Sequence, residues 1–370
     1  MLLGDLGARV IKIEQPRKGD DTRAWGPPFV AGESAYFLSI NRNKESLTLD
    51  FKQARGRAIL DRLIAKADVL VENFRPGTLG RMNLDYASLA KTHPRLIYCS
   101  LSGFGHTGPR TKEAGYDAVL QGEGGIMSLT GSPDAPPFRV GVAIADIVSG
   151  MFAAQGISAA LYARERTGRG QHVDIAMLDS VAALLTYQAG IYFTTDVTPQ
   201  RMGNRHPTIV PYESFTASDG EFMLAVGTDE QWNKFCEVAS LDLGETFATN
   251  RGRVTGYAEL RPKIAQALSA RPRSYWIERL RAAGVPCGSV RNLQELFADP
   301  QIAAREMVVG MTHPSAGNIR VLGSPLKLSG TAASQRTAPP TLGQHTERVL
   351  REDLGLSADA LDELRAGGVV

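Results

Sequence analysis

The sequence predicts an α/β protein in which a large domain built on a parallel sheet is joined to a smaller α+β domain. In the first half of the chain, short runs rich in β-branched residues alternate with helical patterns. Near residue 200 this alternation gives way to a Pro/Gly-rich connector and a hairpin pattern. The length of 370 residues also favours two domains, because a single hydrophobic core seldom grows that large.

Three buried strands are predicted in the first half, at 8–14 (ARVIKIE), 67–73 (ADVLVEN) and 95–101 (RLIYCSL). Between the first two, residues 53–67 show the apolar spacing of a helix face, and the pattern YASLAKTH precedes the third. Strands separated by helices of this length pair in parallel. The large domain is therefore predicted to have three layers, with helices covering the sheet.

The next elements are a long helix, a turn and one more strand. Residues Asp146 to Arg164 are small and apolar, which predicts a helix packed closely against other backbones. The segment TGRGQ (167–171) predicts a turn. Residues 172–178 (HVDIAML) predict a strand that leads into a helix.

The second half begins with a hairpin whose strands are YESFTA (212–217) and EFMLAVG (221–227), joined by a turn at Ser218, Asp219 and Gly220. Helical patterns follow over 229–283. A Pro/Gly segment, PCGSV, and an acidic turn, ADPQ, come next. We predict a large domain over 1–190, a small domain over 205–310, and a C-terminal segment, 325–370, that returns to the large domain.

Composition argues against several classes of protein. The chain has 41 basic and 39 acidic residues, a balance that argues against a nucleic-acid partner. Its 3 cysteines are far apart, and none of its 6 histidines stands at zinc-ligand spacing, so we expect neither disulfides nor a metal. No apolar run approaches the roughly 20 residues of a membrane helix. The N-terminus has no signal-peptide pattern. We expect a cytoplasmic protein without a membrane partner.

Asp146 is the candidate nucleophile. It follows the apolar run RVGVAIA and opens the predicted long helix, where the positive end of the helix dipole favours an ionised carboxylate. A carboxylate in such a place can attack a thioester carbonyl and form a covalent intermediate. The alternative is that Asp146 only caps the helix, which is the more common role of Asp at this position.

Glycine-rich and basic segments supply weaker signals for a ligand. GEGG (122–125) and SGFGHTGP (102–109) either present backbone N–H groups to an oxyanion or form tight turns, and neither matches a nucleotide-binding fingerprint. Basic side chains in two other segments could meet phosphates at the carboxyl ends of the strands, or could simply be solvated. These side chains are Lys44, Lys52, Arg75 and Arg81.

Taken together, these segments resemble the class III CoA-transferase family, which includes formyl-CoA transferase, carnitine CoA-transferase and α-methylacyl-CoA racemase. The motifs that carry the resemblance are LGDLGARVIKIE, GDDTRAWGPPF, NRNKESLTLDFK, DVLVENFRPG, GFGHTGP, AGYDAV, GVAIADIVSG, TGRGQHVDIAMLD, GVPCGSV and LGQHTERVL. They occur in order over nearly the whole chain. The sequence is most similar to the transferases that use succinyl-CoA and act on dicarboxylates such as glutarate.

The resemblance implies roles for particular residues. Asp146 matches the nucleophile, which would exchange the donor thioester for an aspartyl-CoA thioester and then pass CoA to an acceptor carboxylate. Tyr116 and Asp117 match positions that line the thioester site, and Trp25 matches a tryptophan near it. The other matches to positions that bind CoA or substrate are Gln15, Leu49, Asp50, Lys52, Asn73, Phe74 and Arg81. Gly203, Asn204 and His206 match positions near a substrate-gating loop, where this chain has GNRHP in place of a run of glycines.

The resemblance also implies a Rossmann-like large domain and an interlocked homodimer, with the connectors 190–210 and 310–340 as structural ties. It implies no metal and no cofactor other than the CoA thioester substrates. About two dozen residues precede LGDLGA in family members, so the resemblance implies a further strand and a CoA-contacting loop before Met1.

Two other functions fit the same sequence. A racemase would abstract an α-proton with a His and an Asp, but Tyr116 stands where the racemases carry the His, and a Tyr with an ordinary pKa near 10 is a poor base. A CoA-binding protein without catalysis is the third possibility. If the acid is a dicarboxylate, then Arg139, Arg205 or His206 could pair with its second carboxylate.

Overall fold

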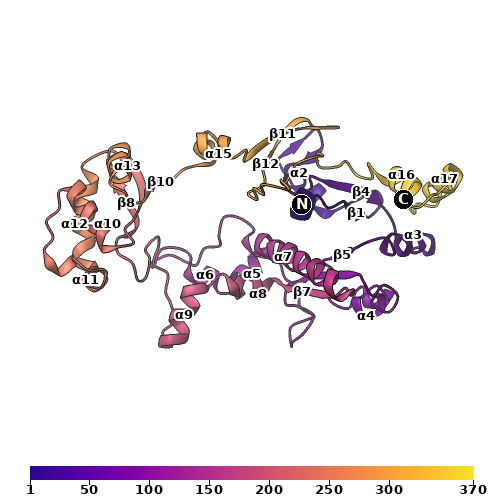
Figure 1. The fold of residues 1–370 in the computed structure, drawn as a ribbon, viewed down its shortest axis with the longest axis horizontal. Coiled ribbons are helices and arrows are strands. Elements are labelled where there is room, and N and C mark those ends of the chain that lie inside the picture. Colours follow the sequence, from indigo (N-terminus) through magenta and orange to yellow (C-terminus); the bar gives the residue numbers. More distant parts are fainter. The chain divides into compact units, whose positions relative to one another are not determined.

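The computed structural model describes all residues, 1–370, and the chain forms two compact units (Figure 1). The first unit contains residues 1–114, 147–177 and 296–370, and the second contains residues 115–146 and 178–295. The two units thus alternate along the chain, whereas the predicted domains 1–190, 205–310 and 325–370 are continuous segments.

The first unit contains five parallel strands in two separate sheets. Strand β1 (Val10–Glu14) pairs in parallel with β4 (Lys44–Thr48). Strands β5 (Val69–Glu72), β6 (Ile97–Ser102) and β7 (His172–Ala176) form the second sheet, with β6 in the centre. This confirms the prediction of an α/β fold with parallel strands.

A hydrophobic core forms between β4 and helices from distant parts of the sequence. Helix α3 (Ala54–Ile64) buries one face, on which Ile59 and Ile64 lie, against Leu47 of β4. Helix α17 (Ala358–Ala366) contributes Leu361 and Leu364 to the same core. The C-terminal helices and the first half of the chain are therefore parts of one packed structure.

Helix α7 (Ile144–Thr167) packs its Ala153 and Ile157 against Cys99 of β6. Its small residues permit this close approach, as the sequence predicts: a Cβ on Gly156 would lie 2.8 Å from Val173. The expectation that no apolar segment reaches membrane length is wrong, because α7 is long and apolar enough by length and composition. This is weak evidence for a membrane span, because core helices of soluble proteins meet the same criterion.

The second unit contains a three-stranded antiparallel sheet and its covering helices (Figure 1). The hairpin of β8 (Tyr212–Ala217) and β9 (Gly220–Ala225) is extended by β10 (Cys287–Ser289) in the order β10-β9-β8. The core between sheet and helices includes Phe222 and Leu224 of β9, together with Trp232 and Phe235.

The other elements are shorter or connect the main ones. In the first unit they are α1 (Leu2–Asp5), η1 (Asp21–Ala24), β2 (Phe29–Val30), β3 (Glu33–Ser34), α2 (Ala35–Ile40), η2 (Gly80–Met82), α4 (Tyr86–Leu89), α15 (Pro300–Ala304), β11 (Val308–His313), β12 (Gly317–Leu322), α16 (Thr346–Arg348) and the π-helix η4 (Val349–Asp353). Elsewhere they are α5 (Asp117–Glu123), α6 (Ile126–Leu129), α8 (Met177–Ala183), α9 (Thr186–Thr195), α10 (Asp229–Ala239), η3 (Glu245–Phe247), α11 (Asn250–Thr255), α12 (Tyr257–Ser269), α13 (Arg273–Ala282) and α14 (Leu293–Phe297).

Several local predictions were wrong. Residues 44–48, read as basic residues in turns, form the partly buried strand β4, and PCGSV contains strand β10. The predicted acidic turn ADPQ starts helix α15, with Asp299 as the N-cap. The predicted connector 310–340 contains most of the β11–β12 hairpin. In each case pairing with a partner along the chain, or a cap, outweighs the weak local pattern.

Candidate active site

Asp117 and Asp146 lie together in the second unit. Asp117 is the first residue of α5, and its Oδ1 accepts the backbone N–H of Ala145 at 2.9 Å. Helix α7 begins at Ile144, so Asp146 lies inside its first turn and does not cap it, contrary to the capping alternative. The Asp117 carboxylate instead satisfies one of the unpaired N–H groups at this helix terminus.

Gln121 holds Asp117 in place. Its Nε2 donates to Asp117 Oδ2 at 2.8 Å and to the carbonyl oxygen of Val142 at 3.3 Å, and its Oε1 accepts the N–H of Val140 at 2.8 Å. The side chain is fully buried. Gln121 was not predicted from the sequence, although its spacing of four residues from Asp117 on one helix is a usable signal.

The electrostatic environment of Asp146 differs from the expectation. Burial, and then the nearby charge of Asp117, raise the pKa of the Asp146 carboxyl group above its ordinary value. The favourable helix dipole is therefore outweighed. Because burial and Asp117 both destabilise the anion, conversion of Asp146 into a neutral acyl derivative would relieve the repulsion. This suits a nucleophilic carboxylate.

Tyr116 and the segment 203–206 belong to the same unit. Tyr116 precedes α5, and its side chain is 72% exposed. Gly203 has a left-handed backbone (φ 62°), and its N–H donates to the carbonyl oxygen of Gly131 at 3.0 Å. Asn204 Nδ2 donates to Ser214 Oγ at 3.0 Å. This segment is thus tied to two other parts of the unit.

His206 is held between aromatic rings. Its ring centroid lies 5.0 Å from that of Tyr187 and 5.3 Å from that of Tyr212. The backbone N–H of His206 donates to the carbonyl oxygen of Tyr212 at 2.9 Å, and its Nδ1 accepts the N–H of Thr208. Burial lowers the pKa of the His206 imidazole, which favours the neutral form.

Gln15, Leu49 and Asp50, predicted to bind CoA, lie at the carboxyl ends of β1 and β4 in the first unit, the edge at which parallel sheets bind ligands. Leu49 is 1% exposed and belongs to the core, so its side chain is not available to a ligand. Its N–H donates to the carbonyl oxygen of Glu14, and that of Asp50 donates to the carbonyl oxygen of Val369.

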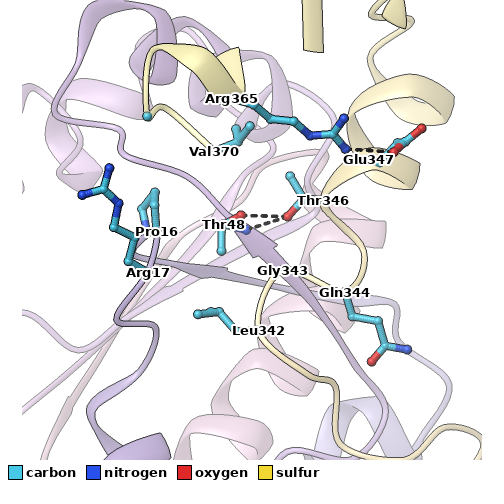
Figure 2. A pocket seen from close by; sticks show the side chains of 11 residues that line it. Pro16, Arg17, Thr48, Leu342, Gly343, Gln344, Thr346, Glu347, Arg365 and Val370 are labelled. Carbon is cyan, nitrogen blue, oxygen red and sulfur yellow. Dashed lines mark hydrogen bonds and ion pairs between the residues drawn. The ribbon is translucent and has the colours of Figure 1, made fainter. Parts of the chain in front are cut away.

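A cavity of about 500 Å³ opens at this edge (Figure 2). Thr48 and Thr346 meet across it, with 2.9 Å between their hydroxyl oxygens. Arg17 and Arg365 also line the cavity, and Arg365 forms an ion pair with Glu347 at 2.9 Å. None of the predicted CoA residues lines this cavity, although Thr48 directly precedes Leu49. The structure therefore offers a cavity of mixed charge beside these residues that the sequence did not predict.

Asn73 and Phe74 follow β5. Asn73 Nδ2 donates to the carbonyl oxygen of Leu101 at 2.7 Å, and the 45% exposed ring of Phe74 meets Phe51 edge-on, with 6.4 Å between centroids. Glu72 shapes this turn, because its Oε2 accepts the N–H of Phe74 at 2.8 Å. Glu72 is buried and was missed by the sequence analysis.

The basic candidates differ in availability. Lys52 and Arg81 are exposed and can reach a ligand. Lys44, in contrast, donates to Asn41 Oδ1 at 2.8 Å, and burial lowers the pKa of its amine to about 8. Lys44 therefore serves the interior of the fold, and the expectation that it meets a phosphate is not supported by its position.

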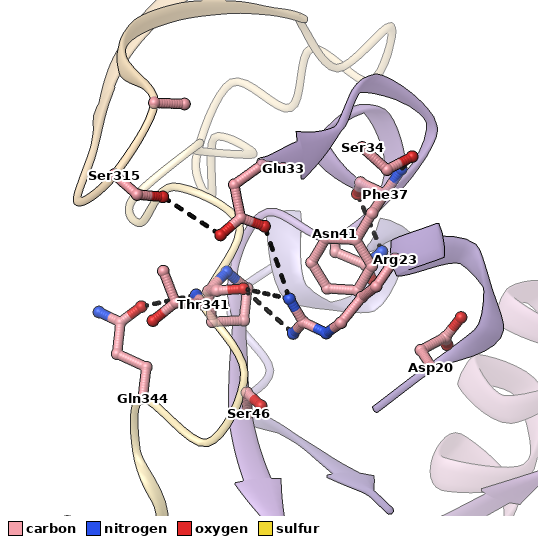
Figure 3. Close-up of polar contacts among 12 residues, drawn as sticks. Asp20, Arg23, Glu33, Ser34, Phe37, Asn41, Ser46, Ser315, Thr341 and Gln344 are labelled. Carbon is pink, nitrogen blue, oxygen red and sulfur yellow. Dashed lines mark hydrogen bonds and ion pairs between the residues drawn. The ribbon is translucent and has the colours of Figure 1, made fainter. Parts of the chain in front are cut away.

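Trp25 is presented by a segment that Arg23 anchors (Figure 3). Its ring meets Tyr36 edge-on at 4.9 Å between centroids and is 46% exposed. Arg23 donates to both carboxylate oxygens of Glu14 at 2.8 Å and to the carbonyl oxygen of Pro340. Its guanidinium lies 3.7 Å from the ring centroid of Phe37.

Glu14 is the buried acid of this network. Burial favours its neutral form, but hydrogen bonds from Arg23 and Ser46 outweigh this effect and lower the pKa of the carboxyl group. Glu14 therefore stays ionised and links β1 to β4. The hydroxyl of Ser315 donates to Glu33 Oε1 at 3.1 Å (Figure 3). The segment that carries Trp25 is therefore joined to a part of the chain far along the sequence.

Comparison with known proteins assigns the chain to a family. The family model for CoA-transferase family III matches residues 1–346. Succinyl-CoA:glutarate CoA-transferase of Mus musculus is 40% identical over 100% of this chain and 86% of that protein. Succinate--glutarate CoA-transferase of Agrobacterium fabrum is 41% identical over 95% of this chain and 90% of that protein.

A solved structure, a CAIB/BAIF family protein from Brucella suis, is 42% identical and superposes with a TM-score of 0.82 over 95% of this chain and 93% of that chain. Acetyl-CoA:oxalate CoA-transferase of Acetobacter aceti is 41% identical over 95% of this chain and 90% of that protein. The chain belongs to CoA-transferase family III and is an enzyme of that class.

Proposed function

We propose that this enzyme moves CoA from succinyl-CoA to a dicarboxylic acid such as glutarate, with Asp146 as the nucleophile. The observation that carries the proposal is the Asp146 carboxyl group in the first turn of α7, whose pKa is raised by burial and by the anchored carboxylate of Asp117. The substrates are those in the names of the mouse and Agrobacterium relatives.

The reaction proceeds by two exchanges at one carboxyl group. The Asp146 carboxylate attacks the donor thioester carbonyl, which breaks the C–S bond and gives a mixed anhydride and CoA thiolate. The thiolate attacks the aspartyl carbonyl, so that succinate leaves and Asp146 becomes a CoA thioester. The acceptor carboxylate then repeats both steps in reverse, releasing its own CoA thioester and the free Asp146 carboxylate.

One thioester replaces another, so the overall free energy change of the reaction is small. The protein's contribution is to align the reacting groups and to stabilise the charges that develop during the reaction. Asp117 fixes the start of α7 and raises the free energy of the Asp146 anion, while Gln121 fixes Asp117. Backbone N–H groups near the reacting carbonyl would stabilise its oxyanion, an effect worth roughly 3–4 kcal/mol for one donor.

We further propose that the enzyme is an interlocked homodimer. Several large apolar side chains of α9 and the segment after it are exposed, including Tyr187 (52%), Phe193 (78%) and Val197 (65%). Large apolar side chains exposed along one segment suit an interface between chains. Light scattering coupled to size-exclusion chromatography should give the mass of two chains, and a single-chain mass would contradict the proposal.

We also propose a reducing, cytoplasmic location and no cofactor beyond the CoA thioesters. The three cysteines are free, which fits a reducing compartment. The proposed reaction changes no oxidation state and needs no Lewis acid. Transfer activity should therefore survive dialysis against EDTA, and its loss would contradict this part of the proposal.

The experiment that tests the function is a transfer assay by liquid chromatography and mass spectrometry. Purified protein is mixed with succinyl-CoA and one of glutarate, malate, itaconate, oxalate or acetate. New acyl-CoA should form with glutarate in the wild type and should be absent in Asp146→Ala. Product formation by Asp146→Ala equal to wild type would refute the role of Asp146.

A further inference from the structure

A second cavity, of about 230 Å³, lies within the second unit beside the segment that carries Gly203. Its lining includes the apolar side chains of Leu129, Leu184, Leu185 and Met202, and Arg205 is its one charged residue. The volume equals that of about eight water molecules at about 30 Å³ each. It is large enough for a small organic acid and too small for CoA.

The guanidinium of Arg205 lacks a partner for part of its donor set. Its Nε is buried and has no hydrogen-bond acceptor. The side chain is nevertheless fixed, because the guanidinium carbon lies 3.4 Å from the ring centroid of Tyr257. Because this Nε atom is enclosed, the part of Arg205 that a ligand in the cavity can meet is the terminal end of the guanidinium, where a charge-assisted hydrogen bond would add affinity.

The carboxylate that contacts Tyr257 is already paired with another arginine. Glu213 of β8 accepts the Tyr257 hydroxyl at 3.1 Å and Arg261 Nε at 2.8 Å through the same oxygen. Arg261 therefore balances the charge of Glu213, and Arg205 contributes an uncompensated positive charge. An anion is the ligand that such a site selects.

The cavity is structurally coupled to the candidate nucleophile's surroundings. Gly203, two residues before Arg205, donates to the carbonyl oxygen of Gly131, and Phe138 donates to that of Thr130. Two residues after Phe138, the N–H of Val140 donates to Gln121. The Arg205 segment and the Asp117 group are thus joined through hydrogen bonds inside one compact unit.

We propose that this cavity is the subsite for the remote carboxylate of the dicarboxylic acid, with Arg205 as its specificity-determining residue. The apolar walls receive the methylene groups of the acid, and the guanidinium binds the carboxylate that does not react. This inference rests on the proposed transfer function. A planar guanidinium held by an aromatic ring is suited to the planar carboxylate.

The test compares acceptors of equal chain length with and without the second carboxylate. Values of kcat/KM for glutarate and for pentanoate are measured at saturating succinyl-CoA in wild type, Arg205→Gln and Arg201→Gln. Arg201 is a matched control because it lies on the same segment and only donates to the carbonyl oxygen of Ser132 at 3.3 Å. The ratio of glutarate to pentanoate should fall about 10- to 100-fold in Arg205→Gln, as expected for loss of a charge-assisted hydrogen bond.

An unchanged ratio in Arg205→Gln, or an equal fall in Arg201→Gln, would overturn the inference. If the Gln variant does not fold, Arg205→Lys serves instead, and its ratio should fall several-fold because an ammonium cannot make the planar paired contact. Calorimetric binding of glutarate to wild type and Arg205→Gln separates the two proposals. If glutarate binding depends on Arg205 but no transfer occurs, the proposed function is refuted and the subsite is retained. If transfer occurs but glutarate binding does not depend on Arg205, the subsite is refuted and the proposed function is retained.

Discussion

The carboxylate of Asp117 accepts the N–H of Ala145 at 2.9 Å, so a side chain of one helix caps the helix that carries the candidate nucleophile in its next residue. Asp117 therefore has two effects on Asp146. It fixes the start of α7, and its charge raises the pKa of the Asp146 carboxyl group together with burial. A single substitution of Asp117 should therefore change both the start of α7 and the pKa of Asp146.

The first prediction concerns the pH dependence of transfer. Asp146 must be ionised to attack, so kcat/KM for succinyl-CoA should fall as pH drops through its raised pKa. Asp117→Asn removes the neighbouring charge, which should lower the pKa of Asp146 and move the acidic limb to lower pH. Asp134→Asn, at an exposed position of the same unit, is the control and should leave the limb in place. A limb that moves to higher pH in Asp117→Asn would contradict the electrostatic interpretation.

The second prediction concerns Gln121. Gln121→Leu leaves the N–H of Val140 and part of the Asp117 carboxylate without their buried partners, which costs about 1–3 kcal/mol for each such group. Denaturant unfolding should show a lower stability, and kcat should fall because Asp117 is no longer held. Gln121→Glu retains an acceptor for Val140 but repels Asp117, so it should restore little activity. Wild-type kcat in Gln121→Leu would show that the contact has no part in catalysis.

The third prediction concerns Glu72 and the loop of Asn73 and Phe74. Glu72→Ala removes the acceptor for the Phe74 N–H and should raise KM for succinyl-CoA about 5- to 10-fold, as expected from about 1 kcal/mol. The value of kcat should change little, because the loop is assigned to binding. Glu72→Gln keeps an acceptor oxygen and should be milder. Steady-state rates over a range of succinyl-CoA concentrations give KM for each protein. An equal KM in wild type, Glu72→Ala and Glu72→Gln would rule out this positioning role.

The fourth prediction compares a buried ion pair with an exposed one. Arg42 and Asp5 are 2% and 1% exposed and form two hydrogen bonds, at 2.6 and 3.0 Å. Arg42→Met leaves the Asp5 charge buried and should lower the free energy of unfolding by about 3–5 kcal/mol. Arg55→Met, which breaks the exposed pair with Glu363, should cost at most about 1 kcal/mol. Urea unfolding measures both, and equal losses would contradict the dependence on burial.

The fifth prediction uses two glycines in different surroundings. A Cβ at Gly170 would lie 2.0 Å from the carbonyl oxygen of Leu96, so Gly170→Ala must displace the backbone before β6 and should lower the melting temperature. A Cβ at Gly190, in α9, meets no atom within 4 Å. Gly190→Ala should instead stabilise the helix by up to about 1 kcal/mol. Differential scanning calorimetry compares the two variants, and a neutral Gly170→Ala would show that Leu96 can move freely.

Local pattern was sufficient to predict much of the fold. The parallel strands β1, β5, β6 and β7, the helix α3 and the β8–β9 hairpin follow from apolar runs and periodicity in their own residues. Strand β4 was missed because its sequence, KESLT, is largely polar. Its Ser46 and Leu47 are fully buried, and the Ser46 hydroxyl donates to Glu14 of β1 and accepts the N–H of Gly343, near the other end of the chain.

The sequence by itself determined the family, the parallel α/β character and the candidate nucleophile, because motif order and apolar periodicity are properties of neighbouring residues. Only the tertiary structure decided which groups surround that nucleophile: Asp117 as the cap of α7, Gln121 as its support, and Arg205 with an unsatisfied donor. It likewise decided that Arg23 binds the carbonyl oxygen of Pro340. Hydrogen bonding and burial depend on atoms brought together from distant positions, so no local pattern contains them.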